Sequence, residues 1–366
     1  MKRMSLVLLW CVPAFGGFSW STQLTYDHTK VGAGIENESN FPAVIFGSDA
    51  SLKTTANGGK VISSSGADIL AFSDSACSSQ IPSELEFYDG ANGILDLHVK
   101  LSLLSSIGDG SIYLCVGNAA PPARMSGVWD SYFQQVLHVS SGTALNLSDS
   151  SGNGYAASGV SSPGATAGKI DGGVSFNGSG QYLTTTANII NNNTDLFTVS
   201  AWAYPNGTSG SRNIFASGAL GGGFSIQLRQ DNSDWNSYIY NGGLPNASYA
   251  GGVIPNTWSY VVTTWDGSNL TLYVNGLLRA STPATSRARA GTLSGWGNDV
   301  LDGFQYWLGS LDEMRVSNVA RSAGWISTEY QNGNAPGNIG SPGFWTWGSW
   351  RAPGGTNTSA GIPIVM

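Results

Sequence analysis

Residues 258–276 read W-S-Y-V-V-T-T-W-D-G-S-N-L-T-L-Y-V-N-G. Two runs rich in β-branched and aromatic residues, 258–265 and 270–274, are followed by Asp266-Gly267 and Asn275-Gly276. Both dipeptides tolerate the positive φ that tight hairpin turns demand. The stretch therefore predicts consecutive antiparallel strands, with a third strand from Leu277.

Similar short runs recur along the chain, whereas helical periodicity is rare. Clear examples lie at 41–46, 68–72, 95–101, 112–116, 198–203, 224–228 and 238–240. Because turn-forming residues bound these runs, the pattern predicts antiparallel β-sandwiches and not βαβ units. One helix is predicted from Arg321 towards Tyr330, although Gly324 weakens it.

Length and composition narrow the class of protein. A chain of 366 residues suits two domains of roughly 100–200 residues each. The 13 Trp, 14 Tyr and 13 Phe residues carry more apolar surface than a disordered chain would leave exposed to water, so the chain is expected to fold. The net charge is −7, so the protein is not attracted to the negatively charged phosphate backbone, and no nucleic-acid partner is expected.

The beginning of the chain has the features of an export signal. A basic start, the apolar run 6–12 and small residues near Gly16 predict a signal peptide at 1–16, and hence a secreted or cell-surface protein. A lipidated Cys11 is the alternative, although a bulky Trp precedes it. No other stretch approaches the ~20 apolar residues of a membrane span, so no integral membrane segment is expected in the mature chain.

Removal of the signal peptide leaves Cys77 and Cys115. An exported protein tolerates disulfides, so the two can pair. Alternatively, Cys115 is a small buried apolar residue within the strand-like run 111–116, and Cys77 is a loop thiol. Both interpretations stay open because the sequence does not give the Cα separation.

The chain divides at a turn-rich stretch, residues 117–122, which predicts a domain boundary near residue 125. The expected organisation is a signal peptide at 1–16, a β-sandwich domain at 17–125, a second domain at 126–350 and a flexible tail at 351–366.

Four segments beyond the boundary carry a family resemblance. They are D-S-S-G-N-G at 149–154, G-G-V-S-F-N-G at 172–178 followed by Tyr182-Leu183, the hairpin at 258–276, and L-G-S-L-D-E-M-R-V-S-N at 308–318. In this order they resemble the LamG-like, concanavalin A-like lectin/glucanase jelly roll of bacterial secreted proteins. The resemblance implies an all-β fold of two antiparallel β-sandwich domains, the second a LamG/concanavalin-like jelly roll.

The upstream part resembles a bacterial domain of unknown function that commonly precedes such jelly rolls. Its marks are D-H-T-K-V at 27–31, N-F-P-A-V at 40–44, D-I at 68–69, S-E-L-E at 83–86, I-Y at 112–113, G-N at 117–118 and G-V-W-D at 127–130. No activity is known for that family, so the resemblance implies an architecture but no reaction.

Calcium is the cofactor that the resemblance implies. LamG-like domains often hold one calcium ion, which prefers oxygen ligands from Asp, Asn and backbone carbonyls. The matching positions are Asp149, Asn153 and Asp312. Alternatively, Asp149 and Asn153 only stabilise a turn.

Flat aromatic rings, which stack on sugar rings, are the expected ligand-binding groups. Trp235 and Trp296 are expected to be exposed because Asp, Asn, Ser and Gly flank them. Packing is favoured for Tyr306 and Trp307, which adjoin a core strand and follow Phe304. The predicted ligand-binding residues are Trp235, Tyr238, Tyr240 and Trp296.

Signs of catalysis are sparse. The E-x-D-x-(x)-E strand signature of glycosidases is absent, and the nearest carboxylates are Glu84 with Glu86, two apart on a predicted strand and sharing one face. A solvated strand face is the favoured interpretation. Asp312 and Glu313 are adjacent, so they are expected to point to opposite faces.

The histidines add no catalytic or metal pattern. His28, His98 and His138 are too far apart in the sequence to form a zinc-binding motif or a Ser/His/Asp relay with neighbouring residues. Each is expected to be a packed or surface residue.

The sequence thus favours a secreted or cell-surface carbohydrate-binding or adhesion protein, not an enzyme, whose partner is a polysaccharide or glycoconjugate. One alternative is a structural protein of an envelope, matrix or phage particle that acts through protein contacts. The other is a glycoside hydrolase that uses Glu84 and Glu86.

Overall fold

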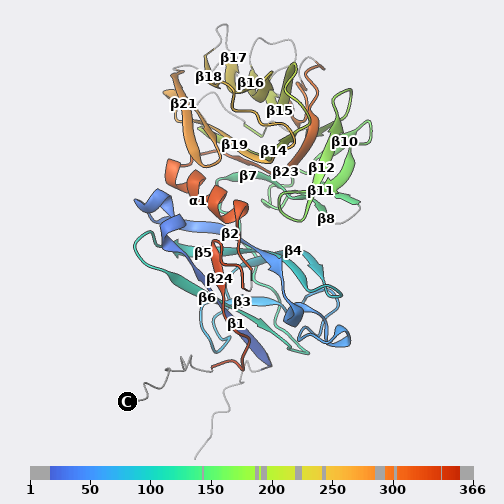
Figure 1. Ribbon diagram of the computed structural model, residues 1–366, viewed down its shortest axis with the longest axis vertical. Coiled ribbons are helices and arrows are strands. Elements are labelled where there is room, and N and C mark those ends of the chain that lie inside the picture. Colours follow the sequence, from blue (N-terminus) through green and yellow to red (C-terminus); the bar gives the residue numbers. More distant parts are fainter. Residues whose placement is uncertain are drawn as a thin grey trace, which may run out of the picture.

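The computed structural model describes residues 17–141, 144–185, 189–190, 196–218, 225–240, 245–284, 293–300, 303–338 and 340–354. Two β-rich lobes stack along the long axis (Figure 1). Antiparallel strands are the main regular element of the described chain, which confirms the all-β class. The predicted signal peptide, Cys11 and residues 355–366 of the predicted tail lie outside the described residues.

The first domain is a sandwich of two antiparallel sheets. The four-stranded sheet has the order β24 (Trp345–Trp347), β1 (Trp20–Tyr26), β6 (Gly110–Val116), β3 (Leu70–Phe72). The three-stranded sheet has the order β2 (Glu38–Ser48), β5 (Ile94–Leu104), β4 (Ser83–Asp89). Short 3-10 turns lie at His28–Lys30, Gly32–Gly34, Ala50–Leu52 and Thr55–Asn57. Buried Leu24, Leu97 and Leu114 share the core between the sheets.

The end of the chain returns to this first domain. Strand β24 pairs with β1, Leu24 opposite Trp347, and Trp345 is fully buried in the first domain's core. The Trp345 indole Nε1 donates a hydrogen bond to the Val44 carbonyl at 2.8 Å. The predicted second domain at 126–350 therefore extends too far at its C-terminal end. Local sequence does not indicate which of the two domain cores a returning strand joins.

The second domain is a larger sandwich. One sheet has the order β11 (Gly164–Ala167), β12 (Gly172–Asn177), β23 (Leu308–Ser317), β14 (Phe197–Pro205), β19 (Ser259–Trp265), β20 (Asn269–Val274), β21 (Leu277–Pro283), and β7 (Phe133–Leu137) also pairs with β23. This is the eight-stranded sheet. The seven-stranded sheet has the order β10 (Ser158–Val160), β13 (Tyr182–Thr185), β22 (Leu293–Trp296), β15 (Ser211–Gly218), β16 (Ser225–Asp231), β17 (Asp234–Tyr240), β18 (Asn246–Tyr249). A small hairpin joins β8 (Val139–Ser141) to β9 (Ala144–Asn146).

The hairpins predicted from residues 258–276 are confirmed. Strands β19 and β20 pair through Val261 and Val274, and β20 continues into β21. Gly267, Asn275 and Gly276 have the positive φ values of 93°, 54° and 73° that such turns require.

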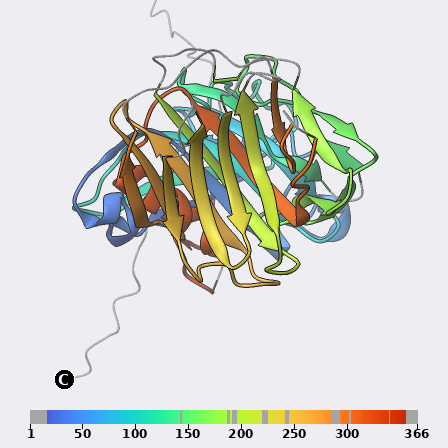
Figure 2. The same ribbon diagram turned by 90° about the horizontal axis from the view of Figure 1, so that it is seen from above.

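The two outer faces of the second domain have different surroundings. On the eight-stranded sheet, Trp202 and Tyr260 pack against Ile326 of helix α1 (Ala323–Asn334), and Phe133 and Val136 of β7 belong to the first domain's core. The seven-stranded sheet lies at the far end of the molecule, where Figure 2 shows its outer face towards the viewer. No described helix or strand covers that face.

The two cysteines that follow the predicted signal peptide form a disulfide. Cys77 and Cys115 are bonded with their Cα atoms 6.3 Å apart, and both are buried beside Leu70 and Phe72. Of the two alternatives that the sequence left open, the structure has the paired one.

Replacement of Trp345 by Ala tests the return of the chain. The substitution empties a fully buried site in the first domain's core, so we expect a loss of about 3–5 kcal/mol in the free energy of unfolding, measured by urea denaturation. Trp20→Ala, at a site that is 37% exposed, serves as control and should cost far less. Equal, small losses for both variants would contradict the placement of β24.

Candidate functional site

The two tryptophans predicted to bind sugar are core residues, so that prediction was wrong. Trp235 and Trp296 are both 0% exposed. Their indole Nε1 atoms donate to the Gly252 carbonyl at 3.0 Å and to Gln135 Oε1 at 2.9 Å. Polar flanking residues indicated exposure, but the strand alternation of β17 turns Trp235 inward. Trp307 is also fully buried, as the packing interpretation expected.

Tyr238 lies on the outer face of the seven-stranded sheet. It is half-buried, and its hydroxyl donates to Asp231 Oδ2 at 2.7 Å. The Arg229 guanidinium lies 4.0 Å from the centre of the Tyr238 ring, and Arg229 Nε is 3.0 Å from Asp231 Oδ2. Burial, together with the bond to Asp231, raises the pKa of Tyr238. The side chain of Tyr240 lies outside the described residues.

Further polar side chains extend this group across β16. Arg229 Nη1 donates to Gln227 Oε1 at 2.7 Å, and Gln227 Nε2 donates to Asp299 Oδ2 at 2.8 Å. Gln305 Oε1 accepts from Asn213 Nδ2 at 2.8 Å. Arg229, Asp231, Tyr238 and Gln227 are called the outer-face cluster below.

Aromatic rings lie in the segments next to the outer-face cluster. The rings of Tyr182 and Tyr306 are 6.2 Å apart, and Phe304 is 47% exposed. Sequence reasoning named Phe304 and Tyr306 but did not select them, because nothing local separates a ring at the sheet face from a packed one.

The residues predicted to bind calcium hold turns and loops. Asp149 Oδ1 accepts from the backbone N–H groups of Val136 and Ser151, both at 2.9 Å, and Asn153 Nδ2 donates to the Phe133 carbonyl at 2.8 Å. Asp312 Oδ2 accepts from the backbone of Lys169 and Ile170 at 2.8 and 2.9 Å. Asp149 and Asp312 thus have separate donor sets. Calcium binding by these three residues stays a prediction.

A second polar group lies buried between the domains, and sequence reasoning missed it. His98 of β5 and His138, which follows β7, have ring centres 4.6 Å apart. Glu86 Oε2 of β4 is 3.2 Å from His98 Nε2 and 3.1 Å from His138 Nδ1. His138 Nδ1 is 2.6 Å from Glu313 Oε1 of β23. These four residues are called the interdomain cluster. His98 and His138 are packed residues, as expected, but their spacing in the sequence did not show that they meet.

Strand irregularities bring the carboxylates into this cluster. Glu86 lies where the pairing of β4 with β5 shifts register, and Glu313 has a φ of 48° beside a register shift between β14 and β23. Leu311 and Met314 both pack in the second domain's core. Asp312 and Glu313 therefore both point away from that core, and the expectation of opposite faces was wrong, because a bulge breaks strand alternation.

Burial controls the protonation of the interdomain cluster. It raises the pKa of Glu86 and of nearby Asp96 well above their usual values, and neighbouring carboxylates add to this. Burial alone would also raise the pKa of Glu313, but adjacent His138 and Arg315 lower it. Burial lowers the pKa of His98, whereas Glu313 raises that of His138 despite burial.

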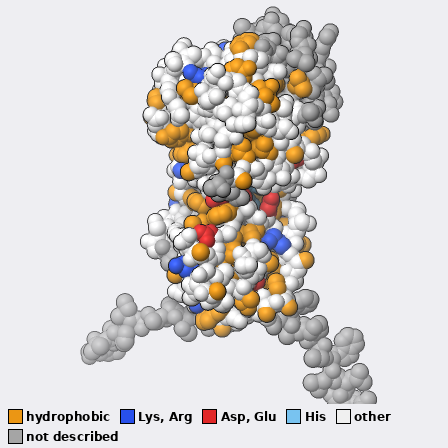
Figure 3. Space-filling model, turned by 90° about the vertical axis from the view of Figure 1, so that its right-hand side faces the viewer, with side chains coloured by type: hydrophobic (Ala, Val, Ile, Leu, Met, Phe, Trp, Pro, Cys, Tyr) orange, Lys and Arg blue, Asp and Glu red, His pale blue; other side chains and the backbone are white. Residues whose placement is uncertain are grey.

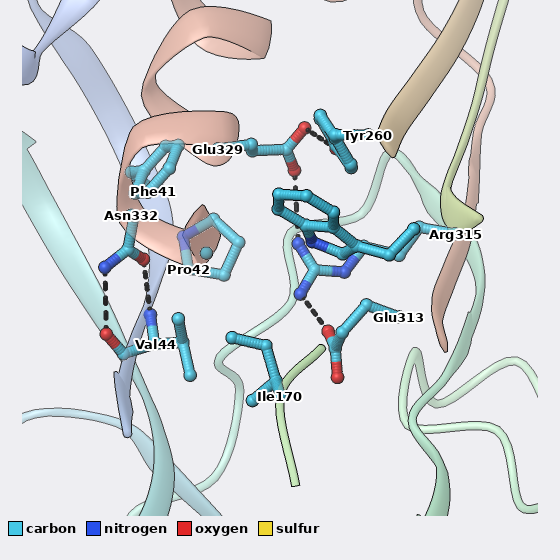
Figure 4. Close-up of a pocket in the computed structure, with 11 residues that line it drawn as sticks. Phe41, Pro42, Val44, Ile170, Tyr260, Glu313, Arg315, Glu329 and Asn332 are labelled. Carbon is cyan, nitrogen blue, oxygen red and sulfur yellow. Dashed lines mark hydrogen bonds and ion pairs between the residues drawn. The ribbon is translucent and has the colours of Figure 1, made fainter. Parts of the chain in front are cut away.

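Arg315 connects this cluster to helix α1. In Figure 4 it lies between Glu313 and Glu329, with Arg315 Nη1 3.3 Å from Glu329 Oε1. The Tyr260 hydroxyl donates to Glu329 Oε2 at 2.7 Å, and the Asn332 side-chain amide bonds both backbone groups of Val44. The cavity among these residues measures about 20 Å³, room for about one water, so it is no ligand pocket.

An open hollow of about 530 Å³ lies beside the cluster, lined in part by Glu84, Trp129 and Ser150. Glu84 accepts from Trp129 Nε1 and from Ser150 Oγ, both at 2.6 Å. Glu84 is 31% exposed and Glu86 only 5%, so the first lies at the rim and the second inside.

A comparison with family models identifies part of the chain. Residues 177–327 match the model of the concanavalin A-like lectin/glucanases superfamily. The second domain is a concanavalin A-like domain. The separate resemblance of the first domain to a domain of unknown function stays a prediction. No curated protein sequence matches the chain significantly.

The chain is also similar to several solved structures. Domain 4 of AbnA, a GH43 extracellular arabinanase from Geobacillus stearothermophilus in complex with arabinotriose, is 18% identical with a TM-score of 0.39, over 50% of this chain and 92% of that domain. The Ruminococcus gnavus IT-sialidase CBM40 bound to α2,3 sialyllactose is 13% identical with a TM-score of 0.37, over 43% and 96%. The botulinum neurotoxin serotype G binding domain is 14% identical with a TM-score of 0.46, over 54% of this chain and 50% of that one.

The surface is poor in charge. Seen from the side in Figure 3, uncharged polar and hydrophobic groups make up most of both lobes. Among the described residues, no helix is long and apolar enough to cross a membrane.

Arg315→Gln tests the electrostatics of the interface. The change leaves Glu313 and Glu329 buried without their cation, so we expect a loss of about 3–5 kcal/mol in the free energy of unfolding by urea denaturation. Arg279→Gln, on the exposed strand β21, is the matched control and should be near neutral. An Arg315→Gln protein as stable as this control would refute the role given to Arg315.

Proposed function

We propose that the concanavalin A-like domain binds carbohydrate on the outer face of its seven-stranded sheet, and that the protein is a secreted or cell-surface carbohydrate-binding protein that catalyses no reaction. The observation that carries this proposal is the outer-face cluster, a network of planar polar side chains and a tyrosine ring on the sheet face that no described helix or strand covers.

The packing of the domains limits where a ligand can bind. The outer face of the eight-stranded sheet is occupied by α1 and the first domain, through contacts such as that of Trp202 and Tyr260 with Ile326. A large ligand such as a polysaccharide therefore has the other broad face of the sandwich available. That face points away from the first domain, so an extended polysaccharide can lie across it (Figure 1).

The chemistry of the outer-face cluster suits sugar hydroxyls, which both donate and accept hydrogen bonds. Arg229 offers donors, Asp231 offers acceptors and the Gln227 amide has both. The Arg229 and Asp231 side chains are only 18% and 19% exposed and bind one another, so they are already held in place before a ligand arrives. Such preorganisation lowers the entropic cost of binding.

The aromatic residues of this region provide the apolar half of sugar recognition. A ring stacks on the C–H face of a sugar while polar groups bind its edge. Tyr238 lies within the cluster, and exposed Phe304 follows a segment whose Asp299 bonds Gln227. In this proposal, Tyr238 and Phe304 take the role that the sequence assigned to Trp235 and Trp296, which are buried.

Binding without hydrolysis accords with how the carboxylates of this face are used. Asp231 accepts from the Tyr238 hydroxyl and pairs with Arg229, and Asp299 accepts from Gln227. A glycosidase needs one carboxyl group as an acid and another as a base or nucleophile. We propose that both carboxylates instead orient the binding groups.

The proposed location outside the cell rests on two features. One is the predicted signal peptide at 1–16, and the other is the Cys77–Cys115 disulfide, a bond typical of oxidising compartments.

Affinity gel electrophoresis against a panel of polysaccharides tests this function. At least one polymer should retard the wild-type protein, and Arg229→Ala and Tyr238→Ala should each weaken that retardation about tenfold or more, as expected for central binding residues. Tyr238→Phe, which keeps the ring and loses the hydroxyl, should weaken it less than Tyr238→Ala.

Tyr132→Ala is the matched control, because Tyr132 is 51% exposed and precedes β7 on the side of the first domain. It should bind like the wild type, and thermal melting should confirm that every variant is folded. If no polysaccharide retards the wild type, or if Arg229→Ala binds unchanged, the proposal fails and a structural role through protein contacts becomes the better account.

A further inference from the structure

We propose that the interdomain cluster is a binding site for one divalent transition-metal ion, best suited to Zn²⁺, with Glu86, His98, His138 and Glu313 as ligands. Two ligands come from the first domain and two from the second, so the bound ion would fasten the domains together. The inference is independent of carbohydrate binding.

The four donor atoms lie close to the spacing of a tetrahedral site. With metal–ligand bonds of about 2.0–2.1 Å, tetrahedral donors lie about 3.3 Å from one another. Distances from the two histidine nitrogens to Glu86 Oε2 and Glu313 Oε1 are 3.2, 3.9, 3.1 and 2.6 Å. All four donors lie within 4.8 Å of one another, so small side-chain shifts suffice to admit an ion.

The donor types indicate which metal the site would take. Two imidazole nitrogens with two carboxylate oxygens suit Zn²⁺ and related transition metals, whereas Ca²⁺ and Mg²⁺ prefer sites made of oxygen. Four protein ligands without an open position are typical of a structural and not a catalytic zinc site.

A second observation points to a ligand at this place. Asp96 is fully buried, its carboxyl group meets that of Glu86, and its Oδ1 lies 3.8 Å from His98 Nε2. Two carboxyl groups in contact need a proton or a cation between them, and with Glu313 close by, this place favours a cation.

Surrounding residues pack on the proposed ligands. Arg315 bonds the second oxygen of Glu313. The Trp129 ring packs on both imidazoles, with ring centres 5.3 Å from His98 and 5.5 Å from His138. Glu84 Oε1 lies 3.9 Å from His138 Nε2, at the rim of the open hollow, which offers an ion a route from solvent.

The test uses the full untagged chain, freed of metal with a chelator and then titrated with Zn²⁺ alone by isothermal calorimetry. We expect one equivalent to bind and the melting temperature to rise, because an ion that binds only the folded state stabilises it. Ca²⁺ should neither bind at this site nor produce that rise. Absence of Zn²⁺ binding, or binding of Ca²⁺ in its place, would overturn the proposal.

Variants locate the binding site. Glu86→Gln keeps the side-chain size and His98→Ala removes a nitrogen ligand, and each should lower Zn²⁺ affinity at least tenfold, with far-UV circular dichroism confirming the fold. His28→Ala is the matched control, because His28 belongs to an exposed group with Asp27 and Asp109 that resembles a metal site in composition. If His28→Ala loses the bound ion while Glu86→Gln and His98→Ala keep it, the assignment is wrong.

Discussion

The contact between the eight-stranded sheet and the first domain includes charges that are buried on both sides. Glu313 lies among His138 and Arg315 of its own domain and His98 and Glu86 of the other. A charge in such a place is stable only while all its partners stay, because removing one leaves another buried and unpaired. Around this cluster the apolar core of the first domain continues into Phe133, Val136 and Trp325. The two lobes are therefore held as one body.

This constraint divides the second domain into a closed and an open side. The outer face of β14, β19 and β23 forms the interface with helix α1 and the first domain. Helix α1 is joined to the first domain by Asn332, whose side chain bonds the backbone of Val44 in β2. The outer face of the seven-stranded sheet carries the outer-face cluster, and no described helix or strand covers it. Strand β24 is a further link between the domains, because the chain returns from the second domain and pairs with β1 in the first.

Local signals in the sequence were enough for the architecture. The Asp-Gly and Asn-Gly hairpins, the helix predicted from Arg321 towards Tyr330 and the family segments within residues 177–327 depend on neighbouring residues, and these predictions are confirmed. The predicted sites were less successful because they depend on side-chain direction. Trp235 was misjudged because flanking polarity does not tell which strand residues point inward, and Asp312 with Glu313 because a bulge cannot be seen in the sequence. His98 and His138 meet only through pairing between distant strands.

Differential scanning calorimetry of the full chain tests most directly whether the two domains form one body. A shared core and a buried charge cluster predict one cooperative transition, with the calorimetric enthalpy equal to the van't Hoff enthalpy. Two separate transitions in the wild-type protein, each with the enthalpy of a single domain, would contradict the account.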